Sequence, residues 1–276
     1  MAHTGREFHG KVVMVIGGGR GIGKRFAIGF ASLGARLALV ARSKAELDLA
    51  HIEIEQHGGN ALRIRGDVVD PEQMAVAVDR VRVAYGVVPD VVICAAGVAG
   101  PLQSFLHSSL KHWKDALHIN LMGVVHACRA VLPGMIERRR GKVIVITCDG
   151  DVAPKLHFSS YSTAKTAVVR FVESVAPEVQ DDNVQINCLD PGQSYTSLTD
   201  EIIRAANRLD HKVVADAIET RRTGGISPDD QIKLAAFLAS ESSNHITGRL
   251  IRVDDDWRKL RNTTLKPDSY TLRRVK

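Results

Sequence analysis

Short apolar runs separated by amphipathic segments constrain the fold of this chain more than any other feature of its sequence. Seven runs rich in Val, Ile and Leu follow one another, at residues 11–16, 36–41, 61–65, 89–96, 142–147, 184–189 and 249–253. Their nearly continuous apolar character is typical of strands buried on both faces, which occur in parallel sheets covered by helices. We therefore predict an α/β fold with a doubly wound parallel sheet of seven strands and helices on both faces.

The segments between these runs carry helix signals. Ser43 with Glu46 three residues later has the pattern of a capping box, and Asp70 before Pro71 has that of an N-cap. Longer helices are predicted at residues 109–139, 160–180 and 228–240. These helices account for most of the chain between the predicted strands.

The length of 276 residues and the 45% hydrophobic content are those of one undivided α/β domain. We expect its core at about residues 10–254 and a C-terminal tail at residues 255–276. Residues 193–225 have weak strand signals and helical patches without a consistent frame, so we predict a mobile substrate-loop region above the sheet.

Composition argues against several classes of protein. No run approaches the roughly 20 apolar residues of a membrane span, and the N-terminus lacks the apolar core of a signal peptide. We expect a cytoplasmic protein that does not associate with a membrane. Its four cysteines are widely spaced, which favours free thiols, and its histidines lack compact ligand spacing, so no metal site is expected.

The formal net charge of +6 raises the question of nucleic acid. The basic residues are dispersed, except at residues 137–142 and in the last twenty residues, and neither cluster interleaves aromatic residues. We therefore expect a solvated basic surface and no nucleic-acid partner.

A glycine-rich turn follows the first predicted strand, in the sequence I-G-G-G-R-G-I-G at residues 16–23. Glycines let a backbone approach a pyrophosphate, and the N-terminus of the following helix supplies unpaired N–H groups. The position between a strand and a helix supports a dinucleotide site in a Rossmann fold. The residues predicted to contact the cofactor here are Gly17, Gly19, Arg20, Gly21, Ile22 and Gly23.

Two arginines favour NADP over NAD. Arg42 ends the second strand, where an NAD site usually has an acid, and Arg20 lies in the glycine-rich turn. Both are positioned to bind a 2′-phosphate, although two solvated side chains are the alternative. Asp67 and Val68 follow the third strand, where Asp67 is either an adenine contact or a helix cap.

Tyr161 and Lys165 stand four residues apart at the start of a predicted helix and therefore share one face. The ammonium favours the phenolate electrostatically, so the phenol becomes a candidate general acid or base. The pair follows the fifth strand of a chain that already has a nucleotide turn.

Taken together, these motifs resemble those of the short-chain dehydrogenase/reductase family from about Gly10 to Asp254. The family's T-G-x-x-x-G-x-G corresponds to residues 16–23, its N-N-A-G to residues 94–97 and its Y-x-x-x-K to Tyr161 and Lys165. Four further positions match the family's motifs: Asn120, Pro191, Gly192 and Thr196. Three positions depart from those motifs: Ile16, Cys94 and Ala95.

The resemblance implies a role for each matched residue. Tyr161 would exchange a proton with the substrate oxygen, while Lys165 would hold the nicotinamide ribose and lower the pKa of the tyrosine. Asn120 would anchor a proton-relaying water, although a packing amide is the alternative. The further cofactor contacts that it implies are Ala95, Ala96, Gly97, Pro191, Gly192 and Thr196.

Cys148 stands where the family has its catalytic serine, thirteen positions before the tyrosine. A thiol is a weaker hydrogen-bond donor than a hydroxyl, so a reductase would be slowed. A thiolate nucleophile flanked by Asp149 and Asp151 and near His157 is the alternative, but neighbouring carboxylates raise a cysteine pKa.

We therefore predict an NADP(H)-dependent oxidoreductase that interconverts a carbonyl and a secondary alcohol. Two alternatives remain: a cofactor-binding sensor without turnover, and a non-redox lyase or isomerase.

The resemblance implies a homodimer or homotetramer built through residues 109–139 and 160–180. The tail would cross a subunit interface, cover the pocket or extend loosely, with Trp257 packed. Five residues hint at a polar or anionic substrate: Tyr195, Arg204, Arg208, Arg221 and Arg222.

Overall fold

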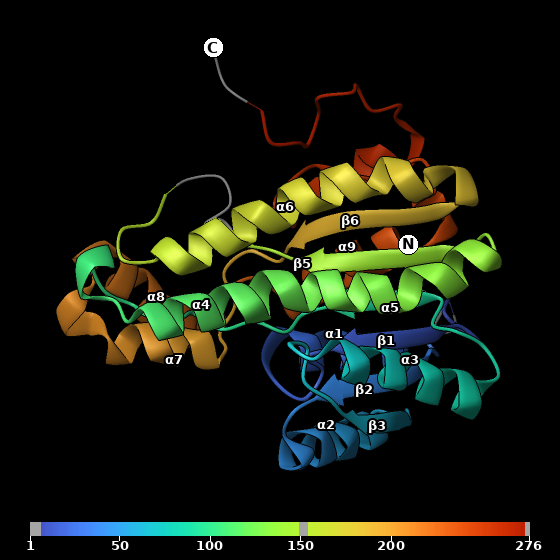
Figure 1. Ribbon diagram of the computed structural model, residues 1–276, viewed down its shortest axis with the longest axis horizontal. Helices are drawn as coiled ribbons and strands as arrows, with labels where there is room; N and C mark the ends of the chain where they lie inside the picture. The colour runs from blue at the N-terminus through green and yellow to red at the C-terminus, as the bar shows by residue number, and fades with distance from the viewer. Residues whose placement is uncertain (1–6, 149–153, 274–276) are drawn as a thin grey trace.

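The computed structural model describes residues 7–148 and 154–273, and these form one parallel sheet covered by helices (Figure 1). The strands are β1 (Val12–Ile16), β2 (Arg36–Ala41), β3 (Ala61–Arg65), β4 (Val91–Cys94), β5 (Gly141–Ile146), β6 (Val184–Asp190) and β7 (Leu250–Arg252). Each lies within two residues of its predicted bounds. The predicted doubly wound sheet is therefore confirmed.

The order of the strands in the sheet is β3-β2-β1-β4-β5-β6-β7. β1 pairs with β2 on one side and with β4 on the other, so the direction of winding reverses between β1 and β4. A ligand crevice forms outside the carboxyl ends of the strands at such a reversal. In Figure 1 these ends point toward α4, α7 and α8.

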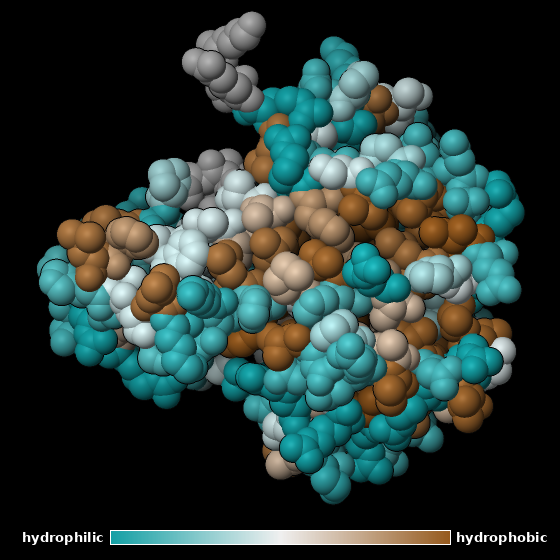
Figure 2. All heavy atoms as spheres, viewed as in Figure 1, coloured by the Kyte–Doolittle hydropathy of each residue, from teal (hydrophilic) through white to brown (hydrophobic). Residues whose placement is uncertain are grey.

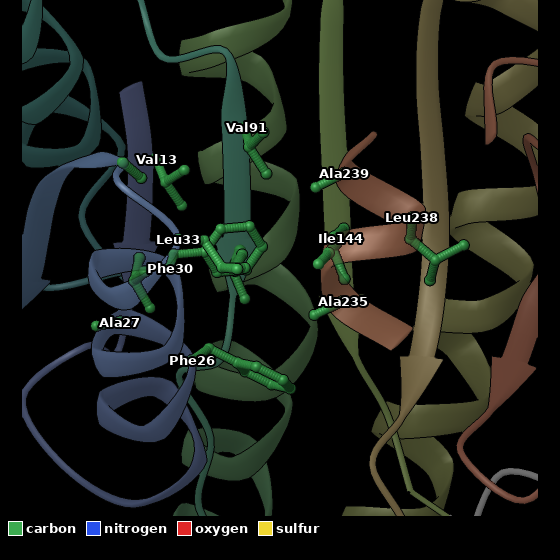
Figure 3. Packing of buried hydrophobic residues seen from close by; sticks show 14 of the residues in the cluster. Val13, Phe26, Ala27, Phe30, Leu33, Val91, Ile144, Ala235, Leu238 and Ala239 are labelled. Carbon is green, nitrogen blue, oxygen red and sulfur yellow. The ribbon is translucent and has the colours of Figure 1, made fainter. Parts of the chain in front are cut away.

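The helices within the described residues are α1 (Gly21–Ser32), α2 (Lys44–Gln56), α3 (Pro71–Tyr85), α4 (Leu110–Leu117), α5 (Gly123–Glu137), α6 (Ser159–Val179), α7 (Ser197–Arg204), α8 (His211–Thr223) and α9 (Pro228–Ala239). One core lies between the sheet and α1, α2 and α9, where Phe26 and Phe30 pack beside Ala235 (Figure 3). A second core lies between the opposite face and α3, α5 and α6. Because both faces are covered, most strand residues are apolar.

Two predicted helix starts have the expected caps. The Ser43 hydroxyl accepts the N–H of Glu46, and the Asp70 carboxylate accepts the N–H of Gln73. The capping box at Ser43 is only half formed, because the Glu46 carboxylate lies beside Arg20 instead. Asp70, and not Asp67, therefore caps α3.

A π-helical turn, η2 (His118–Met122), joins α4 and α5 into a continuous helix. Leu110–Glu137 is the one helix of the described residues that is long and apolar enough to span a membrane by a test of length and composition. Its mean hydropathy is 1.4 in its most apolar segment. Its inward side packs in the core through Ala116, Val124 and Val131. A core helix of this kind meets the same compositional test.

Residues 193–225 differ from the prediction. Most of this region folds into α7 and α8, and Ser194 forms an antiparallel bridge with Gly225. The helices have few apolar positions because they cover a small satellite cluster, in which Leu198 and Val213 pack against buried Leu209. A sparse apolar stripe gives a weak helical period, which explains why the sequence did not predict them.

The described part of the tail packs along the sheet edge and α6. The N–H of Leu250 in β7 donates to the carbonyl of Tyr270 at 2.8 Å, and the N–H of Leu272 donates to the Glu173 carboxylate. Trp257 is buried and stacks on Phe237, as predicted. No described tail residue lines the cavity of its own chain reported below.

The basic cluster at residues 137–142 is engaged in ion pairs. Arg140 lies 2.6 Å and Arg138 3.4 Å from the same carboxylate oxygen of buried Asp90. Arg139 lies 3.2 Å from Asp182. These side chains hold the amino-terminal end of the sheet together, far along the strands from the crevice.

Candidate active site

A cavity of about 880 Å³ opens at the carboxyl ends of the strands. Every residue predicted to bind the cofactor or to act in catalysis lines it, except Gly23 and Asn120. These residues come from loops that follow β1, β2, β3, β4, β5 and β6 and from the start of α6. Parallel strands bring their carboxyl ends to one edge, so positions far apart in sequence meet here.

The glycine-rich turn is packed too closely for side chains at two positions. A Cβ atom on Gly17 would lie 2.5 Å from the N of Ala96, and one on Gly23 would lie 2.3 Å from the carbonyl oxygen of Gly17. Gly17 also has a φ of +84°, which favours glycine. Gly23 therefore acts in the packing of α1 on the turn and does not face the cavity.

The N-terminus of α1 has no side-chain cap and no acidic residue in its first turn. The N-termini of α2 and α3, by contrast, are capped by Ser43 and Asp70. The first N–H groups of α1 are therefore available to an anion at the cavity wall, together with the positive end of the helix dipole. This donor set fits the diphosphate of a dinucleotide.

The two arginines of the cofactor prediction lie at one end of the cavity. Nη1 of Arg20 is 3.4 Å from Oε1 of Glu46, and Nη1 of Arg42 is 3.8 Å from Oδ2 of Asp67. Oδ1 of Asp67 also accepts the N–H of Val69. The arginines are thus loosely paired and about half exposed, rather than free in solvent.

Tyr161 and Lys165 lie in the first two turns of α6, as their spacing predicts. Nζ of Lys165 is 5.8 Å from the centre of the Tyr161 ring and donates to the carbonyl oxygen of Ile146 at 2.8 Å. Lys165 is buried, while Tyr161 is partly exposed to the cavity. A buried ammonium beside a phenol favours the phenolate electrostatically.

Asn120 lies in the π-helical turn and is completely buried. Its amide N donates to the carbonyl oxygens of Val98 and Ala116, both at 2.9 Å, and its Oδ1 accepts the N–H of Val98. A Cβ on Gly97 would lie 2.8 Å from that Oδ1. Asn120 therefore fixes the strand end behind Gly97, and only acceptor capacity remains on its side chain.

Cys148 lines the cavity directly beyond β5 and is partly exposed. Asp149 and Asp151, which entered the nucleophile hypothesis, lie outside the described residues. His157 is described, has a φ of +70° and is not among the described residues that line the cavity. The neighbouring Thr147 is buried, and its hydroxyl makes no hydrogen bond within the described structure.

The turn after β6 carries Pro191 and Gly192 into the cavity wall. Its position is fixed by Asp190, whose Oδ1 accepts the N–H of Gly192 at 2.9 Å and whose Oδ2 lies 2.9 Å from Arg252. Gly192 has a φ of +67°. Thr196 starts α7 and approaches the glycine turn, since a Cβ on Gly21 would lie 3.6 Å from its Cγ2.

Sequence inspection missed several residues of the site. Leu198 and Val213 from α7 and α8 line the cavity, as do Lys155 and Phe158 before α6. The sequence also gave no role to Asp190 or to Gln231, a buried amide in α9. Gln231 stands directly after Asp229 and Asp230 at the start of α9, so its sequence position gave no signal that its amide is buried.

The remaining cysteines, Cys94, Cys128 and Cys188, are buried thiols outside any disulfide, as predicted. Burial raises the pKa of Cys94 to about 12, although Lys165 opposes that shift, and it raises the pKa of Cys128 well above its usual range. These thiols are therefore protonated and unreactive. No group of three metal-binding side chains occurs among the residues that the structure describes.

A parallel sheet with a reversal point, an uncapped helix behind a glycine turn, and a Tyr–Lys pair in one cavity define a dinucleotide-binding protein of the Rossmann type. The sequence profile of the family described as short chain dehydrogenase matches residues 11–207. The chain therefore belongs to the short-chain dehydrogenase family of oxidoreductases, whose fold binds a nicotinamide cofactor and whose members act on small molecules.

Individual relatives agree with this assignment. Oxidoreductase UcpA of Escherichia coli K12 is 33% identical over 244 residues, which cover 87% of this chain and 91% of the relative. A 2,3-dihydro-2,3-dihydroxybenzoate dehydrogenase of Bacillus subtilis is 27% identical, with 90% and 96% covered. Among solved structures, NAD⁺-bound xylitol dehydrogenase has a TM-score of 0.82 at 25% identity, covering 90% of this chain and 98% of its own. Actinorhodin polyketide ketoreductase with NADPH has a TM-score of 0.80, also at 25% identity, with 88% and 95% covered.

Proposed function

We propose that the protein is an NADP(H)-dependent oxidoreductase that interconverts a carbonyl and a secondary alcohol, with Tyr161 as general acid and base. One observation carries the proposal: Tyr161 and Lys165 share a single cavity with the glycine turn at the start of α1. The phenol that moves the proton and the backbone that would bind the diphosphate are thereby held on one rigid scaffold.

When bound, the nicotinamide supplies or accepts the hydride. In the reductive direction the Tyr161 hydroxyl donates its proton to the carbonyl oxygen of the substrate, and in the oxidative direction the phenolate takes a proton from the alcohol. The Lys165 ammonium stabilises the phenolate and would bind the nicotinamide ribose. The water that the family resemblance places at Asn120 would donate a hydrogen bond to the amide oxygen, because both amide hydrogens are already used.

Preference for NADP is supported by the two arginines at the adenosine end of the cavity. A guanidinium binds a 2′-phosphate through charge-assisted hydrogen bonds, whereas the hydroxyl of NAD gains less from a cation. Arg20 and Arg42 approach from the first and second βα turns. Ala95, Ala96 and Gly97 would contact the cofactor, and Asp67 and Val68 would line the adenine pocket.

The substrate side of the cavity supports a small substrate with an apolar part, although the charged residues Lys155, Glu201 and Asp216 line the same side. Phe158, Leu198, Ile202 and Val213 line it around Tyr161. The arginines that hinted at an anionic ligand do not contribute: Arg204, Arg208, Arg221 and Arg222 are absent from the described lining, and Arg222 pairs with Glu219. Apolar walls favour a ligand by removing its apolar surface from water.

Cys148 supports a second candidate function, a cofactor-binding sensor that does not turn over. The thiol would hold a substrate oxygen less firmly than the family's serine. The discriminating experiment measures NADPH affinity by fluorescence and, separately, NADPH oxidation with cyclic ketones and with 2-oxoacids. Oxidation with cyclic ketones is expected; tight NADPH binding without any turnover would favour the sensor, and a rearranged product with unchanged cofactor would indicate a lyase or isomerase.

We also propose a homodimer formed through α5 and α6. Apolar residues gather over these helices on the face shown in Figure 2. Leu132 of α5 and Phe171 and Val175 of α6 are only partly buried. Such a patch is typical of a subunit interface. Light scattering of the wild type and of Phe171→Asp is the test, with a monomeric wild type contradicting the proposal. Reduced buried cysteines support a cytoplasmic location.

A further inference from the structure

Gln231 is a fully buried amide in the second turn of α9, outside the cavity but adjacent to its wall. Its Nε2 donates to the carbonyl oxygen of Pro191 at 2.7 Å and to the hydroxyl of Ser194. Its Oε1 accepts a hydrogen bond from Nη1 of Arg25 at 2.7 Å. One side chain thus connects α1, which begins at the glycine turn, with the turn that follows β6.

Arg25 determines which way the amide of Gln231 points. A guanidinium only donates hydrogen bonds, so it must face the amide oxygen. The NH₂ group is then directed at the Pro191 carbonyl, which only accepts. Arg25 and the Pro191 carbonyl are therefore compatible with one orientation of the amide and not with its flipped form.

The helices on either side of this contact are in close packing. A Cβ atom on Gly29 would lie 2.6 Å from a side-chain carbon of Ile232, one residue after Gln231. Figure 3 shows α1 and α9 on the same face of the sheet, with Phe26 and Ala235 in the shared core. The separation of Arg25 and Gln231 is consequently set by the core rather than by flexible loops.

The turn that Gln231 holds is itself part of the cavity wall. Pro191, Gly192 and Ser194 all line the cavity. Asp190 accepts the N–H of Gly192 from below, and Gln231 binds the carbonyl of Pro191 and the side chain of Ser194. These hydrogen bonds fix the turn at both ends. Ligand binding therefore does not have to order it, which lowers the entropic cost of binding.

We propose that Gln231, oriented by Arg25, is a positioning residue for the nicotinamide half of the cofactor, acting through the turn at residues 191–194. The inference rests on the proposed cofactor site. It adds a residue pair that touches neither cofactor nor substrate. It predicts that substitution of either residue weakens the binding of the nicotinamide half and not that of the adenosine half. The adenosine end, held by Arg20 and Arg42, does not depend on it.

The test compares two probes on the full-length protein: NADPH, and adenosine 2′,5′-bisphosphate, which lacks the nicotinamide half. Gln231→Glu keeps an acceptor for Arg25 but replaces the donor to the Pro191 carbonyl with a carboxylate oxygen. We expect the Kd for NADPH to rise about tenfold, while the Kd for the bisphosphate changes by less than about twofold. Reduced-nicotinamide fluorescence reports the first Kd and calorimetry the second.

Arg25 provides an independent pair of variants. Arg25→Met removes the donor that orients the amide, so NADPH binding weakens. Arg25→Lys keeps a group that donates but cannot accept a hydrogen bond, so its NADPH affinity stays close to that of the wild type. Asn187→Asp is the matched control: this buried amide donates to the Ile246 carbonyl and accepts the N–H of Arg249, away from the cavity. It is expected to lower the melting temperature without changing either Kd.

Three results would overturn the positioning role. These are an unchanged NADPH Kd in folded Arg25→Met and Gln231→Glu, equal weakening of both probes, and weaker NADPH binding in Asn187→Asp to the same extent. Absence of NADPH and NADH binding by the wild type would instead contradict the proposed function, and the positioning role with it. The two failures are distinguishable because the first leaves wild-type binding intact.

Discussion

Arg20 and Glu46 face each other at the adenosine end of the cavity, with Nη1 3.4 Å from Oε1. Glu46 holds this position because its own N–H is bonded to the Ser43 hydroxyl at the start of α2. A 2′-phosphate arriving here would gain Arg20 but would also approach the carboxylate. Glu46 would therefore oppose, through charge repulsion, the NADP preference that we propose from the two arginines.

Substitution at this end is expected to change cofactor selectivity. Arg42→Ala should raise the Kd for NADPH about tenfold or more and leave the Kd for NADH nearly unchanged, because only NADPH has a 2′-phosphate that would lose its partner. Glu46→Gln should lower the Kd for NADPH, because it removes the repulsion between the carboxylate and the 2′-phosphate. Fluorescence titration with both cofactors at several salt concentrations measures these changes; equal effects on NADH and NADPH would refute the NADP assignment.

Replacing the Tyr161 phenol tests the proton-transfer role. Tyr161→Phe should lower kcat by about a hundredfold or more, since a general acid contributes at least that much, while NADPH affinity stays within about twofold. Steady-state kinetics with the best ketone of the panel, together with cofactor titration, gives both values. Retention of most of the wild-type kcat would exclude Tyr161 as the acid.

Cys148→Ser asks whether the thiol is a handicap. A hydroxyl is the stronger donor, so we expect equal or higher reductase activity, by up to about a hundredfold if the thiol fully lacks the donor role. Cys148→Ala is the reference in which no donor remains. Complete loss of activity in a folded Cys148→Ser variant would instead indicate that the thiol is required.

Lys142 makes stability depend on pH. Burial lowers the pKa of its ammonium to about 7, and Nζ bonds to the hydroxyl of buried Ser243. The unfolded chain holds this proton up to its ordinary pKa of 10.5, so between about pH 7 and pH 10.5 it binds more protons than the folded chain. Stability from this group therefore rises with pH across that window and is lowest below it.

Lys142→Met should remove this dependence and stabilise the protein near pH 6 by about 3 kcal/mol. Ser243 keeps satisfied bonds, because its hydroxyl also donates toward the carbonyls of Leu238 and Ser240. Urea unfolding at pH 6 and pH 9 measures the effect, with exposed Lys111→Met as the control. An identical pH slope in wild type and Lys142→Met would contradict the burial argument.

The tail should matter for the sheet edge and not for the cavity. Removing residues 265–276 takes away the Tyr270 carbonyl bound by Leu250 and the contacts of Leu272 with Glu173 and Arg170. We expect a loss of about 2 kcal/mol in unfolding free energy and concentration-dependent association through the exposed β7 edge. Unfolding and light scattering measure these effects, and NADPH affinity should be unchanged; a truncated chain that is monomeric and equally stable would show that the tail is dispensable.

The positions of the strands and of the Tyr161–Lys165 pair followed from the sequence because both depend on local patterns. A strand buried on both faces must be apolar along its length, and a spacing of four residues puts two side chains on one helix face. The helices at residues 197–204 and 211–223 did not follow, since they cover a cavity and a small cluster and therefore have few apolar positions.

The sequence by itself determined the doubly wound sheet, the glycine turn and the placement of Tyr161 and Lys165 on one helix face. Only the tertiary structure decided which charges and amides meet, as with Arg20 and Glu46, or Arg25 and Gln231, which are 206 residues apart. The physical reason is range: backbone preference and hydrophobic period act over a few residues, whereas a hydrogen bond between α1 and α9 exists only once the shared core fixes their separation.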